Sequence, residues 1–276
     1  MTLRQDAQRS KARRQAVKAW GASRKAEAQY VQAIGRIMAT THAAVLKVVE
    51  RERLSKIRAD AAPAGLGEGL LRKIVRWQTP RIQTAFDGMA STADKKAEGA
   101  AALYGIRVRK VPGLADYLEK RRAENVDLVT RATSDFLQQI RNTLDEHEGE
   151  HVESIRNALM ERVDVSVARA TLIARDQSLK LASQLSQKRQ TAAGVSRYRW
   201  SGSLDERERP MHRKLEGLVF LWEGDGPVTN EQGDHNHAGE DYQCRCVPLA
   251  VIAELEPDGE EPEPDEDPNA EGGDED

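Results

Sequence analysis

Two cysteines and one histidine are the residues of this chain with the most specific chemistry. Cys244 and Cys246 stand two positions apart in a Cys-Arg-Cys sequence, and His212 lies upstream of them. Thiolate and imidazole groups are ligands that zinc prefers, so these residues could fill three positions of a tetrahedral site. A carboxylate from Asp241 is expected as the fourth ligand. The alternatives for this position are Asp205, His235 and His237.

The same residues also allow a structure without metal. In a strand, Cys244 and Cys246 would point to opposite faces, one of them buried as a small apolar side chain, with His212 packed nearby. A disulfide between such close neighbours would close a strained ring, and no apolar export leader is found. We therefore expect that both thiols are reduced. Zinc is the only cofactor that the sequence suggests.

A catalytic use of these residues has weaker support. A nuclease would use His212 as a base and Arg207 and Arg209 to bind phosphate, and a thiol nucleophile would pair His212 with one cysteine. No further signature of either chemistry accompanies them. Ion pairs with Asp205, Glu206 and Glu208 on one helix face would equally explain the two arginines. We therefore assign no catalytic residue and expect that the protein is not an enzyme.

A small α+β unit must position these residues. Turn residues are frequent after residue 200, and strands are predicted at 195–200, 218–222 and 244–251, around a short helix from Arg207 to Leu215. The apolar residues of this unit are few. A unit of this size is marginally stable unless something else ties it together.

Long helices are predicted for the chain before this unit. The expected helices cover residues 5–58, 70–103, 114–147, 150–163 and 165–191. A break is expected near Gly35 or Thr40-Thr41 in the first helix, and a boundary or kink at Thr79-Pro80 in the second. Asp164 is the expected N-cap of the last helix. A linker is expected at 61–69 and a short extended segment at 105–113. Within 114–147 an apolar stripe has helical spacing: Leu114, Leu118, Val126, Val129, Phe136, Leu137, Ile140 and Leu144.

The fold class is therefore mainly α, with long N-terminal helices, a small C-terminal α+β domain and a disordered acidic tail. The expected domains are a basic helical arm at 1–60, a helical region at 61–164, the α+β domain at 165–253 and the tail at 254–276.

Charge is distributed unevenly along the chain. Residues 254–276 hold 13 of the 45 acidic residues and no Lys or Arg, so the first 253 residues carry 42 basic against 32 acidic side chains, a net charge of +10. This asymmetry predicts contact with a polyanion, or a solvated basic helix. The candidate DNA contacts are Arg9, Lys11, Arg13, Arg14 and Lys18. No apolar run is long enough to span a membrane, so no membrane partner is expected.

An ordered set of short motifs covers residues 165–252. Ile173-Ala174-Arg175-Asp176-Gln177 is followed by Tyr198-Arg199-Trp200, then by an Asp-x-Arg-x-Arg-x-x-His sequence, Leu215-Glu216-Gly217 and the Cys-Arg-Cys sequence. This order resembles the phage Mu F-like minor head (head morphogenesis) proteins. Asp241 replaces a histidine that some relatives have three residues before the first cysteine, and the proline that members often have there is absent. The residues that match the family motif are Asp205, Arg207, Arg209, His212, Gly217, Cys244, Arg245 and Cys246.

The resemblance implies a minor capsid protein of a tailed phage or prophage. Such a protein enters the procapsid in few copies near the portal vertex and takes part in head assembly and in DNA packaging or ejection. Its expected partners are the portal protein, the major capsid protein or scaffold, and phage DNA through its phosphates. It is expected in the virion, in the head interior or at the portal vertex, and in the host cytoplasm during assembly.

Two alternatives remain from the residues themselves. One is a DNA-binding protein delivered with the genome through its basic N-terminal segment. The other is a nuclease or toxin effector carried in the head, with His212 and Arg207 or Arg209 in its active site.

Overall fold

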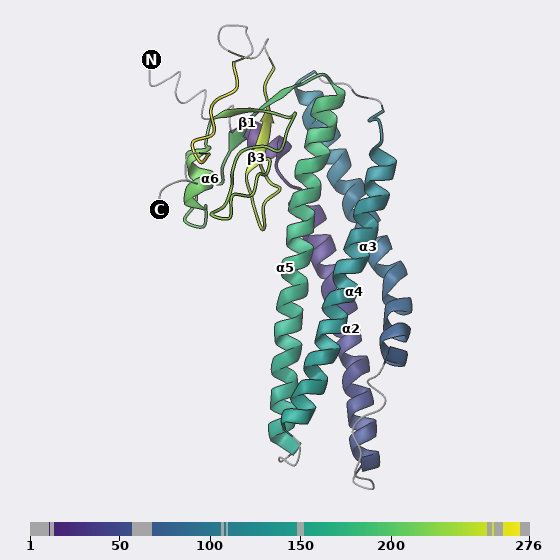
Figure 1. Cartoon of the computed structure of the whole chain (residues 1–276). Coiled ribbons are helices and arrows are strands. Elements are labelled where there is room, and N and C mark those ends of the chain that lie inside the picture. Colours follow the sequence, from purple (N-terminus) through teal and green to yellow (C-terminus); the bar gives the residue numbers. More distant parts are fainter. Residues whose placement is uncertain are drawn as a thin grey trace. The chain divides into compact units, whose positions relative to one another are not determined.

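The computed structural model describes residues 11, 14–56, 68–105, 108, 110–147, 152–252, 256 and 262–270. These residues are mainly helical, with a small antiparallel sheet in the C-terminal region, which confirms the predicted fold class (Figure 1). Two compact units divide the chain. The bundle unit consists of Ala28–Met89 and Asp116–Arg175, and the C-terminal unit consists of Met1–Glu27, Ala90–Ala115 and Asp176–Asp276. No helix of the described residues is both long and apolar enough to cross a membrane.

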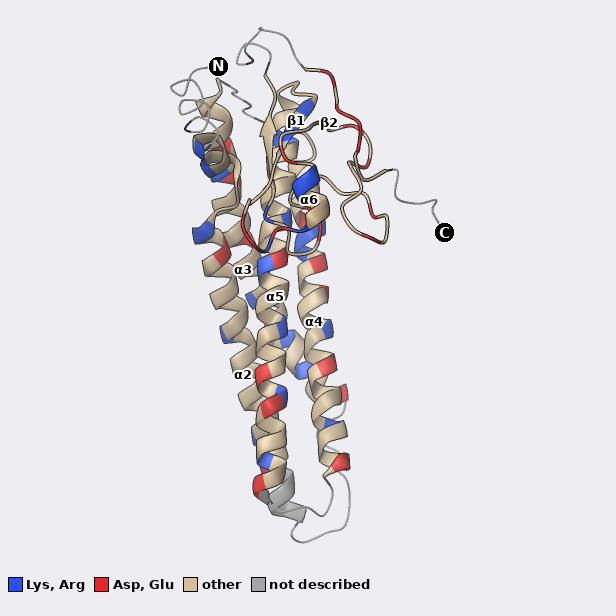
Figure 2. Cartoon of the chain, turned by 90° about the vertical axis from the view of Figure 1, so that its left-hand side faces the viewer, with Lys and Arg blue, Asp and Glu red and all other residues tan. Residues whose placement is uncertain are grey.

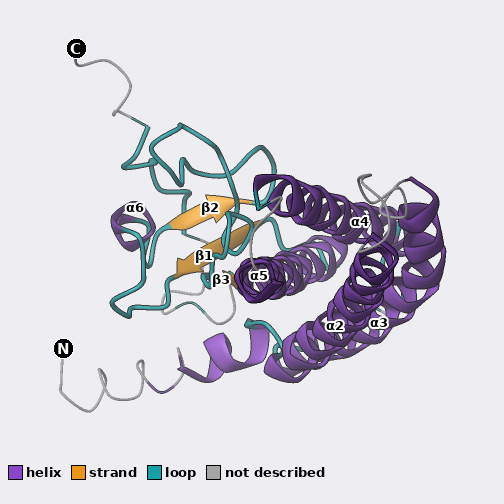
Figure 3. Cartoon of the chain, turned by 90° about the horizontal axis from the view of Figure 1, so that it is seen from below, coloured by secondary structure: helices purple, strands orange, loops and turns teal. Residues whose placement is uncertain are grey.

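Four long helices form the bundle unit. They are parts of α2 (Arg24–Lys56), α3 (Glu68–Leu103), α4 (Leu114–Glu146) and α5 (Val152–Ala192), and the four segments lie side by side in the two views of Figures 1 and 3. The apolar stripe predicted for α4 is buried from Val129 to Leu144. Helical spacing places these side chains on one face, where they contact the apolar faces of the neighbouring helices. This part of the core comprises Val45, Val49, Ile74, Phe136, Leu137, Ile140, Leu144, Ile155 and Leu159.

Buried polar side chains link the helices of the bundle. The Gln78 amide donates to the Thr41 hydroxyl at 2.6 Å, and the Thr133 hydroxyl donates to the Gln78 carbonyl oxygen at 3.1 Å. The Tyr30 hydroxyl donates to Asn125 at 2.9 Å. A buried polar group is costly without a partner, so these bonds disfavour a shifted register between the helices.

The predicted break in the first long helix was misplaced. No break occurs at Gly35 or Thr40-Thr41, where the helix is continuous and the Thr41 hydroxyl bonds back to the Ile37 carbonyl at 2.9 Å. The helical residues 14–20 instead end at Gly21, and α2 begins after Ser23, whose hydroxyl accepts the Ala26 N–H at 3.2 Å. This contact is an N-terminal cap of the kind that serine commonly provides.

Two other predicted helix boundaries were wrong. α3 continues through Pro80, and the Arg81 guanidinium donates to the Trp77 carbonyl at 2.8 Å in this turn. α5 runs unbroken from Val152 to Ala192, so Asp164 lies inside a helix and is not an N-cap. Packing of a long helix in a bundle outweighs the cost of one lost backbone hydrogen bond or of a weak helix former. The linker predicted at 61–69 lies mostly outside the described residues.

The C-terminal unit contains the sheet and a five-residue helix. β1 (Arg197–Ser201) is the central strand, with β2 (Val219–Leu221) and β3 (Val247–Ala250) antiparallel on its two sides. α6 (Pro210–Lys214) lies between β1 and β2 in sequence and is shorter than predicted. The third strand begins only after Cys246, which leaves both cysteines in the preceding loop. The apolar core of this part comprises Tyr198, Trp200, Leu215, Phe220, Trp222, Ala238, Cys244 and Cys246.

Residues from α3 and α5 complete this unit. Arg189 donates to Asp94 at 2.9 and 2.7 Å. The Gln190 amide donates to the Pro248 carbonyl at 3.1 Å and accepts from the Trp222 indole N–H at 2.9 Å. The unit is therefore more extensive than the stretch around the sheet, and its stability does not depend on that small apolar inventory alone.

Part of the acidic tail packs on the C-terminal unit. The Val219 N–H donates to the Asp265 carboxylate at 2.7 Å, and the Asp265 N–H donates to the Val219 carbonyl at 2.8 Å. The Val228 N–H donates to Asp267 at 2.7 Å, and the side chain of Asn269 is buried. Residues 262–270 thus cover the free edge of β2, although the sequence had predicted a disordered tail. Figure 2 shows acidic residues in the loops of this unit, and charges of both signs along the bundle helices.

Candidate functional site

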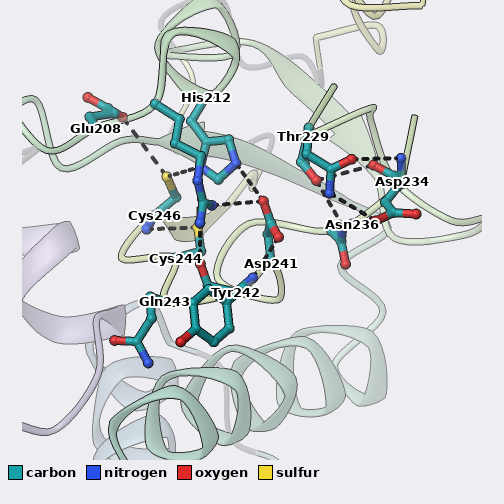
Figure 4. Close-up of polar contacts among 12 residues, drawn as sticks. Glu208, His212, Thr229, Asp234, Asn236, Asp241, Tyr242, Gln243, Cys244 and Cys246 are labelled. Carbon is teal, nitrogen blue, oxygen red and sulfur yellow. Dashed lines mark hydrogen bonds and ion pairs between the residues drawn. The ribbon is translucent and has the colours of Figure 1, made fainter. Parts of the chain in front are cut away.

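The three residues predicted as metal ligands come together in the C-terminal unit. His212 lies on α6, and Cys244 and Cys246 lie in the loop before β3 (Figure 4). The His212 Nδ1 atom is 3.5 Å from each of the two sulfur atoms. All three side chains are buried, and no disulfide joins the two cysteines.

The protonation states of this cluster depend on one another. Burial alone lowers the pKa of His212, but hydrogen bonds with Asp241 and Cys244 raise it to about 9. The hydrogen bond with Cys246 lowers the pKa of the Cys244 thiol, while burial opposes this and His212 adds to it. The pKa of Cys246 is raised because it bonds to Cys244 and is buried. The Cys244 thiol and the His212 imidazole thus shift each other's pKa in opposite directions.

Asp241 contacts His212 on the side away from the sulfurs. Its Oδ2 atom is 3.2 Å from His212 Nε2 and accepts from Arg209 Nη1 at 2.8 Å. Arg209 also donates to the Tyr242 carbonyl at 2.5 Å. Asp241 thus contacts the Nε2 side of the imidazole, and it is not part of the group of three possible ligand atoms that lie within 4.8 Å of one another. In this position the carboxylate can orient the imidazole through a hydrogen bond at Nε2.

The other residues of the family motif make contacts near the cluster. Arg245, between the two cysteines, donates to both carboxylate oxygens of Asp205 at 2.5 and 2.6 Å. Arg207 is exposed and lies 3.8 Å from Asp205. Gly217 has a φ of 84°, which glycine adopts without strain, and its N–H donates to the Trp200 carbonyl at 2.9 Å.

The loop that carries the cysteines is fixed by α5. The Asp176 carboxylate accepts the backbone N–H of Gln243 at 2.8 Å, and Gln243 has a positive φ of 54°. A Cβ atom at Gly239 would come within 2.8 Å of Ser183 on the same helix. Asp176 therefore has a definite role in positioning the loop. The sequence motif included this residue without indicating its partner.

Glu208 is the residue of this site that the sequence reasoning misassigned. One interpretation of the sequence placed it in an ion pair on a helix face, but residues 205–209 precede α6, which begins at Pro210. The Glu208 side chain is buried, with Oε2 accepting the Leu204 N–H at 2.8 Å and Oε1 lying 4.0 Å from Cys246 Sγ. The nearby Gly202 leaves space for the carboxylate, because a Cβ atom there would overlap Oε1. A glycine a few residues before an acid is too common a pattern to have indicated this contact.

The remaining candidates lie apart from the three ligand atoms. His237 is buried against Tyr198, whose hydroxyl is 3.1 Å from its Nδ1. His235 is exposed and contacts the Gly226 carbonyl at 2.8 Å. Of the proposed DNA contacts, Arg9 and Arg13 lie outside the described residues. The other three, on or beside the helical segment 14–20, are exposed: Lys11, Arg14 and Lys18.

The space beside the cysteines is small. A cavity of about 20 Å³ is lined by the Cys-Arg-Cys residues together with Trp20, Ser183 and Pro248. This volume holds roughly one water molecule. A thiolate nucleophile needs access to its substrate, and Cys244 has an exposed fraction of 4%. The arrangement therefore suits metal binding or packing better than catalysis on a small molecule.

Residues 136–249 match the family described as phage Mu protein F-like protein. The match contains α6, β1, β2, all but the last residue of β3, and the whole cluster of His212, Cys244 and Cys246. This part of the chain is similar to the Mu F-like proteins. The resemblance that we drew from the motifs over residues 165–252 is thus confirmed, and the match begins earlier, within α4.

Two curated proteins are similar to this chain. An uncharacterized protein of Haemophilus influenzae is 31% identical over 147 residues, which are 52% of this chain and 32% of that protein. The minor head protein GP7 of Bacillus phage SPP1 is 29% identical over 157 residues, 54% of this chain and 46% of that protein. The aligned parts thus span less than half the length of either relative. No solved structure gives a significant match.

Proposed function

We propose that this protein is a structural component of the head of a tailed phage or prophage. The observation that carries the proposal is the Mu F-like match together with the similarity to a phage minor head protein. The geometry of the site supports a structural role. Asp205 pairs with Arg245, and Asp241 pairs with both Arg209 and His212, so these side chains contact one another rather than converge on a substrate site.

The nuclease alternative has less support from the same geometry. A catalytic histidine must reach the proton that it transfers, whereas His212 has an exposed fraction of 2% and contacts Asp241 and the two sulfurs through its ring nitrogens. Arg207 is exposed, and Arg209 donates to Asp241 and Tyr242. The three side chains do not share one open surface.

The portal vertex is the position in the head that we propose. Surface ion pairs such as Arg131–Asp127 at 2.5 Å and Arg169–Asp135 at 2.9 Å give the bundle charges of both signs, which suits a protein partner. Separate co-expression with the portal protein, the scaffold and the major capsid protein of the same phage tests this position. We expect a complex that survives size-exclusion chromatography with the portal protein. A complex with the capsid protein alone would move the protein to another part of the shell.

Contact with packaged DNA is the second proposal. Lys11, Arg14 and Lys18 are exposed, and phosphate contacts need no base readout. If these three residues bind phosphates, changing them to Glu makes the negative slope of log affinity against log salt concentration shallower, by about 3. The control reverses three exposed lysines elsewhere in the chain and thus has the same net charge: Lys73, Lys95 and Lys120. Equal slopes for the two variants would contradict DNA contact by the basic segment.

Deletion of the gene tests the structural role itself. A head protein that acts in packaging or ejection should leave particles that form but contain less DNA or infect poorly. We expect a fall in plaque titre that is restored by the wild-type gene in trans. An unchanged titre and unchanged DNA content after deletion would contradict the proposal.

A further inference from the structure

Three soft or borderline metal-binding atoms meet in the buried interior of the C-terminal unit. His212 Nδ1, Cys244 Sγ and Cys246 Sγ all lie within 4.8 Å of one another, and none of the three side chains is exposed by more than 6%. They come from two segments, α6 and the loop before β3. Two thiols and an imidazole in van der Waals contact form a metal-ligand set of the kind found in zinc proteins.

The distances fit one tetrahedral zinc ion. Zinc binds sulfur at about 2.3 Å and imidazole nitrogen at about 2.0–2.1 Å, so ligand atoms at the tetrahedral angle are about 3.5 Å apart. The two measured distances from His212 Nδ1 to the sulfurs are both 3.5 Å. Both sulfurs thus already stand at the separation from the imidazole nitrogen that a shared zinc ion requires.

We propose that this protein binds one structural zinc ion through His212, Cys244, Cys246 and Glu208. This inference is independent of the role in the phage head. It replaces Asp241 with Glu208 as the fourth ligand, and the ion would join the turn before α6, α6 itself and the Cys-Arg-Cys loop. A metal bond between these segments stabilises a unit whose sheet has only three short strands.

Glu208 is suited to the fourth position by its burial and its orientation. One carboxylate oxygen accepts the Leu204 N–H at 2.8 Å, which leaves the other, Oε1, at 4.0 Å from Cys246 Sγ. Glu208 is outside the compact group of three ligand atoms. Coordination therefore requires its carboxylate to turn towards His212 and Cys244, a movement within the reach of a glutamate side chain.

The residues around the ligands already have the arrangement of an outer ligand shell. Asp241 Oδ2 lies 3.2 Å from His212 Nε2, and a hydrogen bond donated by Nε2–H to this carboxylate leaves the Nδ1 lone pair directed at the sulfurs. The Cys246 backbone N–H donates to Cys244 Sγ at 3.4 Å, a contact that stabilises a thiolate.

The test begins with the metal content of the full chain, purified without a histidine tag. Elemental analysis should give one zinc per chain for the wild type and less than about a tenth of this for Cys244→Ser and Cys246→Ser, since loss of a ligand sharply lowers metal affinity. The matched control is His235→Gln, which changes an exposed histidine of the same unit and should retain full zinc. A folded wild-type protein without zinc, which also takes up none when zinc is added, would overturn the proposal.

A second measurement does not depend on variants that fail to fold. Cobalt added to metal-depleted wild-type protein should give thiolate-to-cobalt charge-transfer absorption and the strong visible bands of a four-coordinate site. A spectrum without thiolate bands would overturn the site. Glu208→Gln should retain the thiolate bands but bind cobalt at least roughly tenfold more weakly. Unchanged affinity and spectrum in Glu208→Gln would show that Glu208 is not the fourth ligand.

Discussion

Arg245 donates from both terminal nitrogens of its guanidinium to the two carboxylate oxygens of Asp205, at 2.5 and 2.6 Å. This two-pronged ion pair joins the loop after β1 to the Cys-Arg-Cys loop and holds the pKa of Asp205 well below its usual range. It explains why an arginine between the two cysteines has a structural role, since a planar guanidinium fits a carboxylate in this way and a lysine does not.

Replacing Arg245 with Lys should therefore destabilise the C-terminal unit modestly. One of the two hydrogen bonds is lost, and the pair is partly exposed, so we expect the midpoint of thermal unfolding to fall by no more than roughly 4 °C. The control is Arg207→Lys, because Arg207 is exposed and 3.8 Å from the same carboxylate. Differential scanning calorimetry of the two variants compares them directly. An equal effect of both changes would contradict a special role for Arg245.

Asp241 provides a test of the outer shell of the proposed zinc site. Changing Asp241 to Asn keeps its size but weakens the hold on His212 and removes the ion pair with Arg209. We expect zinc affinity, measured by competition with a chelating dye, to fall by about 10- to 100-fold. Asp234→Asn, an exposed change in the same unit, should leave affinity unchanged. An affinity of Asp241→Asn equal to that of Asp234→Asn would contradict a role of Asp241 in orienting His212.

The tail segment 262–270 should stabilise the C-terminal unit. Removing residues 262–276 leaves the backbone N–H groups of Val219 and Val228 without their carboxylate acceptors, at a cost of about 1–3 kcal/mol for each such bond that water does not replace. Chemical unfolding followed by tryptophan fluorescence measures this cost. Deletion of only 271–276 is the control, because it leaves both bonds in place. Identical unfolding curves for the two deletions would show that the segment does not contribute.

The bundle unit should become less stable in acid because of His42. Burial lowers the pKa of this imidazole to about 4, with Nε2 3.1 Å from the Ser166 hydroxyl and the ring 4.2 Å from that of Phe136. Between this value and the usual pKa of about 6.5, the unfolded chain binds a proton that the folded chain does not. The free energy of unfolding therefore falls as pH decreases through this range, by up to about 1.4 kcal/mol per pH unit.

The variant His42→Gln isolates this effect. Its amide can still bond to Ser166, but it cannot take up a proton, so its stability should depend less on pH between about 6.5 and 4 than that of the wild type. Urea unfolding at several pH values gives both slopes. Parallel slopes would mean that folding does not lower the pKa of His42.

The fold class could be predicted from periodicity because one helix face is buried along its whole length, as in the stripe of α4 from Val129 to Leu144. Helix boundaries were less predictable. Pro80 and Asp164 are local signals for a helix boundary, and packing along the bundle outweighs both. The break at Gly21 was not predicted, and there a Cβ atom would come within 2.7 Å of the Val17 carbonyl.

The cluster of His212, Cys244 and Cys246 could be predicted because few other residues of the chain bind soft metals. The burial of Glu208 near this cluster could not. It depends on the turn at 205–209 and on the absence of a side chain at Gly202. The packing of residues 262–270 could not be predicted either, because Asp265 and Asp267 accept hydrogen bonds from the backbone N–H groups of Val219 and Val228, which no sequence pattern indicates.

The central claim, a structural role in a phage head, is tested most directly by quantitative mass spectrometry of purified, nuclease-treated heads from the phage that encodes this chain. We predict that the protein is present in a fixed ratio of a few copies per portal ring and remains after a high-salt wash. Its absence from purified heads, while the portal and major capsid proteins are detected in the same sample, would contradict this account.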